Sequence, residues 1–381
     1  MADDEFRIAA AELRQVRMRL QDRFETSFGV EEERDCLLIR IEGAGETGWG
    51  ECVAGSFPGF SYETVGTAWH ILANHLLPAV LGQPLVGISG LRGRIAPIRG
   101  HPMAKAGLEL AFWDWMGRIA RLPLVDLLGG RRTRVPVGVS VGIQPDIDAL
   151  LKVVDTYLSQ GYARIKLKIK PGIDLEPVGA VRQSFPEVPL QVDGNGGYTP
   201  DQSAELLALD EYNLLLIEQP FSGEQLLAHA RLQERLRTPI CLDESIGSAV
   251  EAQLALQLGA CRIVNIKPGR VGGLSEAVAI HDLCVERGVP VWCGGMLETG
   301  VGRAANLALA TLPGFSLPGD ISASDRYYEQ DIASPRFELN PDGTIEVPAG
   351  PGLGITIDSE ALERVTLRSE RFGAREVEEK R

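Results

Sequence analysis

The stretch "RIKLKIKPG", residues 164–172, decides how the second half of this chain is interpreted. Read as a β-strand, it places its apolar residues on one face and Lys166 and Lys168 on the other, because side chains alternate along a strand. Lysines on one face usually mark an exposed sheet edge, where charge discourages aggregation. The alternative is an interior position, which needs a nearby anion to offset the cost of burial. The residues that follow separate these two interpretations.

Short apolar runs alternate with helix-like segments from about residue 135 onward. The runs are VPVGVSV (135–141), RIKLKI (164–169), VPLQVD (188–193), LLLIE (214–218), PICLD (239–243), RIVNIK (262–267), VPVWC (289–293) and SLPGD (316–320). Repeated strand–helix units predict a parallel sheet, and about eight of them predict a closed barrel. We therefore expect an α/β barrel over residues 135–325.

Charged residues recur at the ends of five consecutive predicted strands. They are Lys168, Asp193, Glu218, Asp243 and Lys267, at intervals of 24 or 25 residues. The carboxyl ends of barrel strands converge on one face, where enzymes of this architecture place their active sites. Charges on helices or loops would have no reason to keep this spacing. We therefore expect these five side chains to meet at one mouth of the barrel.

The three carboxylates of this series belong to adjacent strands and would point at one spot. Buried like charges repel one another unless a cation neutralises them. Because Asp193, Glu218 and Asp243 offer only oxygen ligands, we expect Mg²⁺ here, with Mn²⁺ as an alternative. The other interpretation is that these carboxylates form salt bridges to neighbouring strands.

The lysines end the second and sixth predicted strands, which lie opposite each other in an eight-stranded ring. Lys166 adds a like charge beside Lys168, which favours the neutral amine that acts as a general base. A divalent cation on a substrate carboxylate would stabilise the charge left when a proton α to that carboxylate is removed. With Lys267 opposite, such a site permits racemisation or elimination of a β-leaving group. We therefore favour the interior position and expect a small anionic carboxylate as substrate.

The first 134 residues follow a different pattern. Strand-like segments include DCLLIRIEG (35–43) and GWGECV (48–53), and helical spacing is found in residues 62–81 and 103–120. This pattern predicts an α+β module over residues 1–134. The tail, residues 326–381, returns to short strands and loops, and we expect it to pack on the first module.

Composition excludes several classes of partner. The chain has 381 residues, and its 52 acidic against 38 basic side chains give a formal net charge of −14. Such a surface repels nucleic acid and anionic membranes, so we expect neither as a partner. The sequence has no secretory signal pattern, no apolar run of the roughly 20 residues that span a membrane, and six scattered cysteines. We expect a cytoplasmic protein whose cysteines are small buried residues.

Several motifs occur together and in order along almost the whole chain. They are KLK (166–168), VDGN (192–195), LLLIEQP (214–220), CLDES (241–245), VNIKPGRVGG (264–273) and VWCGGMLETGVGRAAN (291–306), with FETSFG (24–29), GWGEC (48–52) and LPGDISASDR (317–326) outside them. This combination resembles the enolase superfamily in its muconate-lactonizing subgroup, and most closely the o-succinylbenzoate synthase / N-acylamino acid racemase family.

The resemblance implies a modified TIM barrel, (β/α)7β, beneath an α+β capping domain. It implies Mg²⁺ on Asp193, Glu218 and Asp243, with Lys168 and Lys267 as the acid/base pair. It also implies a homo-oligomer, since the family is often dimeric or octameric. Residues implied near the substrate or the metal are Ser140, Lys166, Asn195, Glu244, Arg270, Gly295, Met296 and Tyr62.

Two family activities compete for this chain. One is dehydration of 2-succinyl-6-hydroxy-2,4-cyclohexadiene-1-carboxylate to o-succinylbenzoate, a step of menaquinone biosynthesis. The other is racemisation of N-succinyl or other N-acylamino acids, which an arginine at the place of Arg270 accompanies in this family, unless Arg270 is a solvated loop residue. The cap loop AGSFPGFSYET (54–64) departs from the usual family form, so the exact substrate stays open.

Weaker alternatives lie inside and outside the superfamily. An acid-sugar dehydratase fits the same metal chemistry, and so does a dipeptide epimerase, although CGGMLETG (293–300) lacks the DxD pair of the epimerases. A Schiff-base aldolase would use a strand lysine but needs no carboxylate trio. A non-catalytic binding barrel would need neither.

Overall fold

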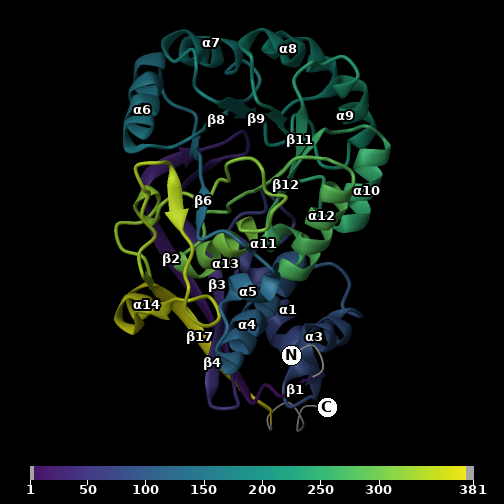
Figure 1. The fold of residues 1–381 in the computed structure, drawn as a ribbon, viewed down its shortest axis with the longest axis vertical. Coiled ribbons are helices and arrows are strands. Elements are labelled where there is room, and N and C mark those ends of the chain that lie inside the picture. Colours follow the sequence, from purple (N-terminus) through teal and green to yellow (C-terminus); the bar gives the residue numbers. More distant parts are fainter. Residues whose placement is uncertain (1–3, 375–381) are drawn as a thin grey trace.

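The computed structural model describes residues 4–374, and Figure 1 shows that they form two parts. In that view the upper part holds short parallel strands with helices around them. The lower part holds a sheet of longer antiparallel strands with helices beside it (Figure 1). These parts are the barrel and the cap that the sequence predicts.

The barrel sheet has seven parallel strands in the order β13-β12-β11-β10-β9-β8-β7. Their bounds are β7 Val139–Val141, β8 Ile165–Lys168, β9 Leu190–Asp193, β10 Ile217–Glu218, β11 Ile240–Leu242, β12 Ile263–Ile266 and β13 Val291–Cys293. Each strand lies within one of the apolar runs read from the sequence, and nearly all of its residues are buried. Strands that are buried on both faces need this continuous apolar character.

The eighth predicted strand is not regular, but its segment closes the ring. Phe315 forms an isolated parallel bridge with Val291, and Gly319 forms one with Val137. Asp320 N also donates to Cys293 O at 2.9 Å. Residues 315–320 therefore join the two edges of the sheet, and Asp320 stands where an eighth strand would end.

Helices separate the strands, as a parallel sheet requires. The main ones are α6 Ile147–Gln160, α7 Leu175–Ser184, α8 Ser203–Ala208, α9 Leu226–Gln233, α10 Ala249–Gln257, α12 Leu274–Glu286 and α13 Gly300–Ala310, with the short α11 Pro268–Val271 after β12. Helix α6 shows how the sequence sets their ends. Asp146 caps its first turn by accepting from Ala149 N at 2.8 Å, and Gly161 ends it at φ 105°.

The cap is built on a four-stranded antiparallel sheet in the order β17-β2-β3-β4. Its strands are β2 Ala10–Glu25, β3 Val30–Gly43, β4 Glu46–Cys52 and β17 Thr366–Gly373. Its helices are α1 Val65–Ile71, α2 Leu77–Val80, α3 Gly87–Ile95, α4 Pro102–Ala120 and α5 Leu124–Leu128, with a π-helical turn, Leu72–Leu76, between α1 and α2. The strand β1 Glu5–Phe6 pairs with β5 Leu85–Val86 beside them.

Helix α4 lies directly on β4 because two glycines leave room for it. A Cβ on Gly50 would stand 2.1 Å from Gly107 O, and one on Gly48 would stand 2.3 Å from Ala111 O. The same contact places Trp115 against Phe6 and Phe112, with ring centroids 5.6–5.7 Å apart. These rings belong to the core of the cap.

The C-terminal segment returns to the cap. Strand β17 pairs antiparallel with β2, with Gly373 opposite Ala10, and α14 (Ser359–Val365) precedes it. Before this, β15 (Thr344–Glu346) pairs with β6 (Arg134–Pro136), and β14 (Ala333–Ser334) pairs with β16 (Thr356–Ile357). The expected domain limits near residues 134 and 326 stay predictions, and the ends of the expected ranges, 1–3 and 375–381, lie outside the described residues.

Two further expectations concern the whole chain. No helix among residues 4–374 is long and apolar enough to cross a membrane. All six cysteines are buried and unpaired within the same part of the chain. Burial raises the pKa of Cys261 to about 12, so this thiol stays protonated at neutral pH.

Candidate active site

The barrel delivers its charged residues to one level. Asp193 and Glu218 are the last residues of β9 and β10 and are register partners, and Lys168 on β8 is paired with Asp193. Asp243 follows β11 directly, and Lys267 follows β12 directly. The five side chains that recur along the sequence therefore stand together at the carboxyl ends of consecutive strands.

Lys166 lies in the interior, which answers the question that its strand raises. Its side chain is only 2% exposed. Its Nζ lies 2.9 Å from Glu218 Oε2 and 3.2 Å from Asp193 Oδ2, and it also contacts Asp320. Burial alone would lower the pKa of Lys166, but the three carboxylates outweigh that effect and raise this pKa well above its ordinary value. Lys166 is therefore a fixed positive charge beneath the site.

Lys168 faces the mouth of the barrel from the same strand. Its Nζ donates to Asp193 Oδ2 at 2.7 Å and to Asn195 Oδ1 at 2.6 Å. Asn195 in turn donates from Nδ2 to Glu244 Oε1 at 3.1 Å. These hydrogen bonds hold the amine of Lys168 beside Asp193, at the edge of the set of carboxylates.

Lys267 approaches from the opposite side of the ring, four strands away. Its Nζ donates to Asp243 Oδ2 at 2.6 Å and lies 4.7 Å from the centre of the Phe60 ring. Burial would lower the pKa of Lys267, but the charges of Asp243 and Glu218 outweigh it and raise this pKa. Lys267 is thus held as an ammonium ion. A Cβ on Gly294 would stand 2.3 Å from Asn265 Oδ1 and 2.7 Å from Lys267 Cε, so a larger residue there would have to displace both side chains.

Arg270 is buried and belongs to the site. Its Nη1 donates to Asp243 Oδ1, and its Nε donates to Ile246 O at 2.7 Å. Its Nη2 donates to Asn265 O at 2.7 Å. The alternative of a solvated loop arginine is therefore wrong. Asp243 lies between Arg270 and Lys267, which together lower its pKa although burial opposes them.

The residues present fit a divalent cation chemically. Burial and the charge of Asp193 raise the pKa of Glu218 to about 8, and burial and the charge of Asp243 raise the pKa of Glu244 to about 7. Glu244 Oε2 is buried and has no hydrogen-bond partner among the described residues. The site thus gathers four carboxylates, Asp193, Glu218, Asp243 and Glu244, and all of its candidate ligands are oxygens.

The carboxylates do not enclose a metal-sized space as they stand. Within residues 4–374, no three carboxylate, imidazole or thiolate groups are close enough together to surround an ion. Lys166 and Lys168 lie between them and neutralise Asp193, whose pKa they lower although burial opposes this. The expectation that Asp193, Glu218 and Asp243 hold the ion stays a prediction.

Both parts of the chain match known family models. Residues 149–361 match the model "Enolase C-terminal domain-like", and residues 8–129 match "Mandelate racemase / muconate lactonizing enzyme, N-terminal domain". The chain belongs to the enolase superfamily. It is 51% identical to the o-succinylbenzoate synthase of Geobacillus kaustophilus, over 94% of this chain and 96% of that protein. It is 50% identical to the N-succinylamino acid racemase of Thermus thermophilus, over 95% of this chain and 98% of that protein.

A solved structure agrees with this assignment. An enolase-superfamily protein from Listeria innocua superposes with a TM-score of 0.93 at 39% identity, over 97% of this chain and all of that one. The expected modified TIM barrel with a capping domain is therefore confirmed.

The remaining predicted site residues of this superfamily member differ in their burial and in their position around the barrel mouth. Ser140 on β7 is the register partner of Lys166 and is buried, and its Oγ has no hydrogen-bond partner in the described part of the chain. Gly295 and Met296 follow β13, and Met296 borders the cap loop. Tyr62 lies on the rim instead, 66% exposed. A cavity of about 1410 Å³ opens at this mouth, lined among others by Tyr62, Asn195, Glu244 and Arg270.

Reasoning from the sequence missed three residues that contact the charged side chains of the site: Asn265, Asp320 and Arg164. Asn265 donates from Nδ2 to Glu218 Oε1 at 2.7 Å, and Asp320 forms ion pairs with Lys166 and with the fully buried Arg164. Side chains alternate between the two faces of the strand VNIK (264–267), so this pattern could have predicted that Asn265 lies on the same face as Lys267. Asp320 ends the eighth apolar run and so extends the regular series of charges.

Proposed function

We propose that this chain is an o-succinylbenzoate synthase, which dehydrates 2-succinyl-6-hydroxy-2,4-cyclohexadiene-1-carboxylate. The observation that carries the proposal is the placement of Lys168 beside Asp193 and of Lys267 beside Asp243, on opposite sides of the barrel mouth. The reaction needs removal of a weakly acidic proton α to a carboxylate, and a lysine beside that carbon is a suitable base. Relatives that are 45–51% identical and named o-succinylbenzoate synthase support it.

Each lysine has its own part in the dehydration. Lys168 removes the α-proton at its Nζ and delivers it to the hydroxyl on the same face of the substrate. This hydroxyl then departs as water. Lys267 remains an ammonium ion, in keeping with its raised pKa, and its charge stabilises the negative charge that develops on the substrate. Lys166 adds a second fixed positive charge, deeper in the barrel beside Glu218.

A divalent cation belongs to this proposal. Mg²⁺, or Mn²⁺ in its place, would be held by Asp193, Glu218 and Asp243 and would supply Lewis-acid stabilisation of the substrate carboxylate. Asn195 and Glu244 support this position through their mutual hydrogen bond at 3.1 Å. The buried Glu244 Oε2, which has no hydrogen-bond partner among residues 4–374, favours such an ion.

N-succinylamino acid racemisation is the second candidate. It is favoured by the burial of Arg270 against Asp243, because this contact fixes the group that faces Lys267. In racemisation Lys168 would remove the proton from one face and the Lys267 ammonium would return one to the other. Both reactions begin with the same proton removal, so one site can perform both.

The proposal extends to the setting of the enzyme. We infer a cytoplasmic role in menaquinone biosynthesis, since dehydration to o-succinylbenzoate is a step of that pathway. We also infer a homo-oligomer, either a dimer or an octamer, with a small anionic carboxylate as substrate and neither nucleic acid nor membrane as partner.

The first experiment is a direct assay. Purified protein with Mg²⁺ is mixed with the cyclohexadiene carboxylate, and o-succinylbenzoate is followed by ultraviolet absorbance. A kcat/KM of at least ~10⁴ M⁻¹s⁻¹ would support the synthase. Lys168→Ala is the inactive reference, and Lys152→Ala, an exposed lysine on α6, is the matched control. Turnover no higher than that of Lys168→Ala would contradict the synthase, and racemisation of N-succinylamino acids would then be tested by exchange of the α-proton in D₂O.

A further inference from the structure

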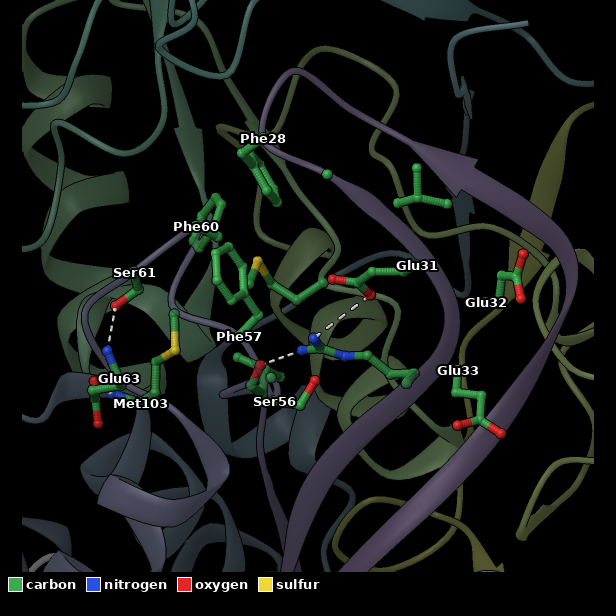
Figure 2. Close-up of a pocket in the computed structure, with 16 residues that line it drawn as sticks. Phe28, Glu31, Glu32, Glu33, Ser56, Phe57, Phe60, Ser61, Glu63 and Met103 are labelled. Carbon is green, nitrogen blue, oxygen red and sulfur yellow. Dashed lines mark hydrogen bonds and ion pairs between the residues drawn. The ribbon is translucent and has the colours of Figure 1, made fainter. Parts of the chain in front are cut away.

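A second cavity lies between the cap and the barrel (Figure 2). Its volume is about 280 Å³, at the small end for ligand pockets, so it suits one arm of a substrate rather than a whole ligand. Its apolar walls come from the cap loops, from α4 and from the segment after β13. They include Phe28, Phe57, Phe60, Met103 and Met296.

This cavity begins one aromatic ring away from the reacting centre. Phe60 stands 4.7 Å from Lys267 Nζ, and it lines both the small cavity and the large mouth cavity. Phe28 and Ser61 are also shared by the two cavities. A substrate held at Lys267 can therefore extend an arm past Phe60 into the small cavity.

One cation on the cavity wall has only part of its hydrogen-bonding capacity satisfied. Arg34 on β3 is only 6% exposed. Its Nη2 donates to Val53 O, but its Nε has no hydrogen-bond partner among the residues described. Its Nη1 lies 3.9 Å from Glu31 Oε2, which is too far for a hydrogen bond. A buried guanidinium with unmet donors is costly, so these donors call for an acceptor.

We propose that Arg34 binds the carboxylate at the far end of the substrate's four-carbon acyl arm and so determines which acyl group is accepted. The inference rests on the proposed function, because the succinyl group is what the two candidate substrates share. Its two methylenes match the apolar walls, and its terminal carboxylate matches a guanidinium, which binds such groups through paired hydrogen bonds.

Glu31 is the competitor for the same guanidinium. In Figure 2, Glu31 reaches toward the cavity, whereas Glu32 and Glu33 point away from its aromatic side. The side chain of Glu31 is 36% exposed, and its buried Oε2 has no hydrogen-bond partner among the described residues, so an outward turn would break no hydrogen bond of this oxygen. Its negative charge should weaken binding of an anionic arm. Arg34 and Glu31 therefore predict substitutions of opposite effect.

The test compares two ligands that differ only at the distal group. Binding of o-succinylbenzoate and of 2-butyrylbenzoate, which ends in a methyl group, is measured by calorimetry with the Mg²⁺-supplied protein. Hydrogen bonds to charged groups contribute roughly 1.5–3 kcal/mol, so the natural chain should favour o-succinylbenzoate by about 10- to 100-fold. Arg34→Met should abolish this preference and leave 2-butyrylbenzoate binding unchanged. Glu31→Gln should strengthen o-succinylbenzoate binding a few-fold.

The outcomes separate the inference from the proposed function. If the natural chain binds both ligands equally, or if Arg34→Met keeps the preference, Arg34 does not read the carboxylate and the inference fails alone. An equal loss for both ligands in Arg34→Met would give Arg34 a structural role and would also overturn the inference. If the natural chain binds neither ligand and dehydrates no substrate, the proposed function fails and the inference fails with it. If Arg34→Met does not fold, the affinity of Glu31→Gln for o-succinylbenzoate tests the inference instead, and an affinity no higher than that of the natural chain would overturn it.

Discussion

Asp320→Asn is the substitution that best tests how the barrel carries its buried charges. The Asp320 carboxylate lies 2.6 Å from Arg164 Nη1 and also contacts Lys166. Arg164 is fully buried, and among the described residues it also donates to Pro318 O at 3.0 Å and lies 5.3 Å from the centre of the Trp292 ring. The amide of asparagine keeps the shape of the carboxylate but removes its charge. Arg164 would then be a buried cation without a counter-ion.

The expected loss follows from this isolation. Breaking a buried ion pair by removing one partner costs roughly 3–5 kcal/mol, because the other charge stays uncompensated. Lys166 keeps Asp193 and Glu218, so most of the loss should come from Arg164. We therefore expect the free energy of unfolding to fall by about 3–5 kcal/mol at pH 7.

The effect should depend on pH in one direction. Burial would raise the pKa of Asp320, but Arg164 and Lys166 outweigh it and lower this pKa below its ordinary value. A carboxyl group with a lowered pKa stabilises the folded state above its unfolded pKa of ~4, and this contribution is lost as the pH falls through the lowered value. The difference between the natural chain and Asp320→Asn should thus be full at pH 7 and shrink only below about pH 4.

Urea unfolding followed by circular dichroism measures the change. Asp155→Asn, on the exposed face of α6, is the matched control and should stay within about 0.5 kcal/mol of the natural chain. Arg164→Met combined with Asp320→Asn should recover part of the loss, because it removes the isolated cation. A loss below about 1 kcal/mol in Asp320→Asn, as for an exposed pair, would refute the reasoning. So would a double variant that is less stable than Asp320→Asn alone.

Three further predictions concern the reaction and the cap. Lys168→Ala should lower kcat by at least ~10²-fold for dehydration and racemisation alike, without changing the urea midpoint by more than the Lys152→Ala control does; a selective loss of one activity would contradict the shared first step. Chelation with EDTA should abolish turnover, and Mg²⁺ or Mn²⁺ should restore it; turnover that survives dialysis against EDTA would rule out the metal on Asp193, Glu218 and Asp243. Gly50→Ala should destabilise the chain by about 1–3 kcal/mol in urea unfolding, because its Cβ would stand 2.1 Å from Gly107 O, whereas Gly93→Ala, with nothing within 4 Å, should not destabilise it through a clash.

The sequence predicted the barrel well because its signals are local. Seven apolar runs became seven strands, and the spacing of Lys168, Asp193, Glu218, Asp243 and Lys267 correctly placed these residues on consecutive strands. Strand periodicity and helix spacing depend on neighbours in the chain. The functional roles of these five residues stay predictions.

The contacts that were missed depend on how the ring closes. Asp320 meets Lys166 only because residues 315–320 join β13 to the segment before β7, and no local pattern reports that closure. The place of Tyr62 near the substrate stays a prediction: its side chain is 66% exposed and lines the mouth cavity. The contact between Arg270 and Asp243 could not be read from the sequence either, because the burial of Arg270 follows from the short helix α11.

The pairing of β17 with β2 has a consequence for the order in which the molecule assembles. The cap sheet places Ala10 beside Gly373, so β2, which is synthesised early, can pair with β17 only after the barrel has been synthesised. During synthesis, the barrel strands leave the ribosome before the edge of the cap sheet is covered. Because the cavity behind Phe60 lies where cap and barrel meet, the ability to recognise a substrate should mature later than the barrel that performs the chemistry.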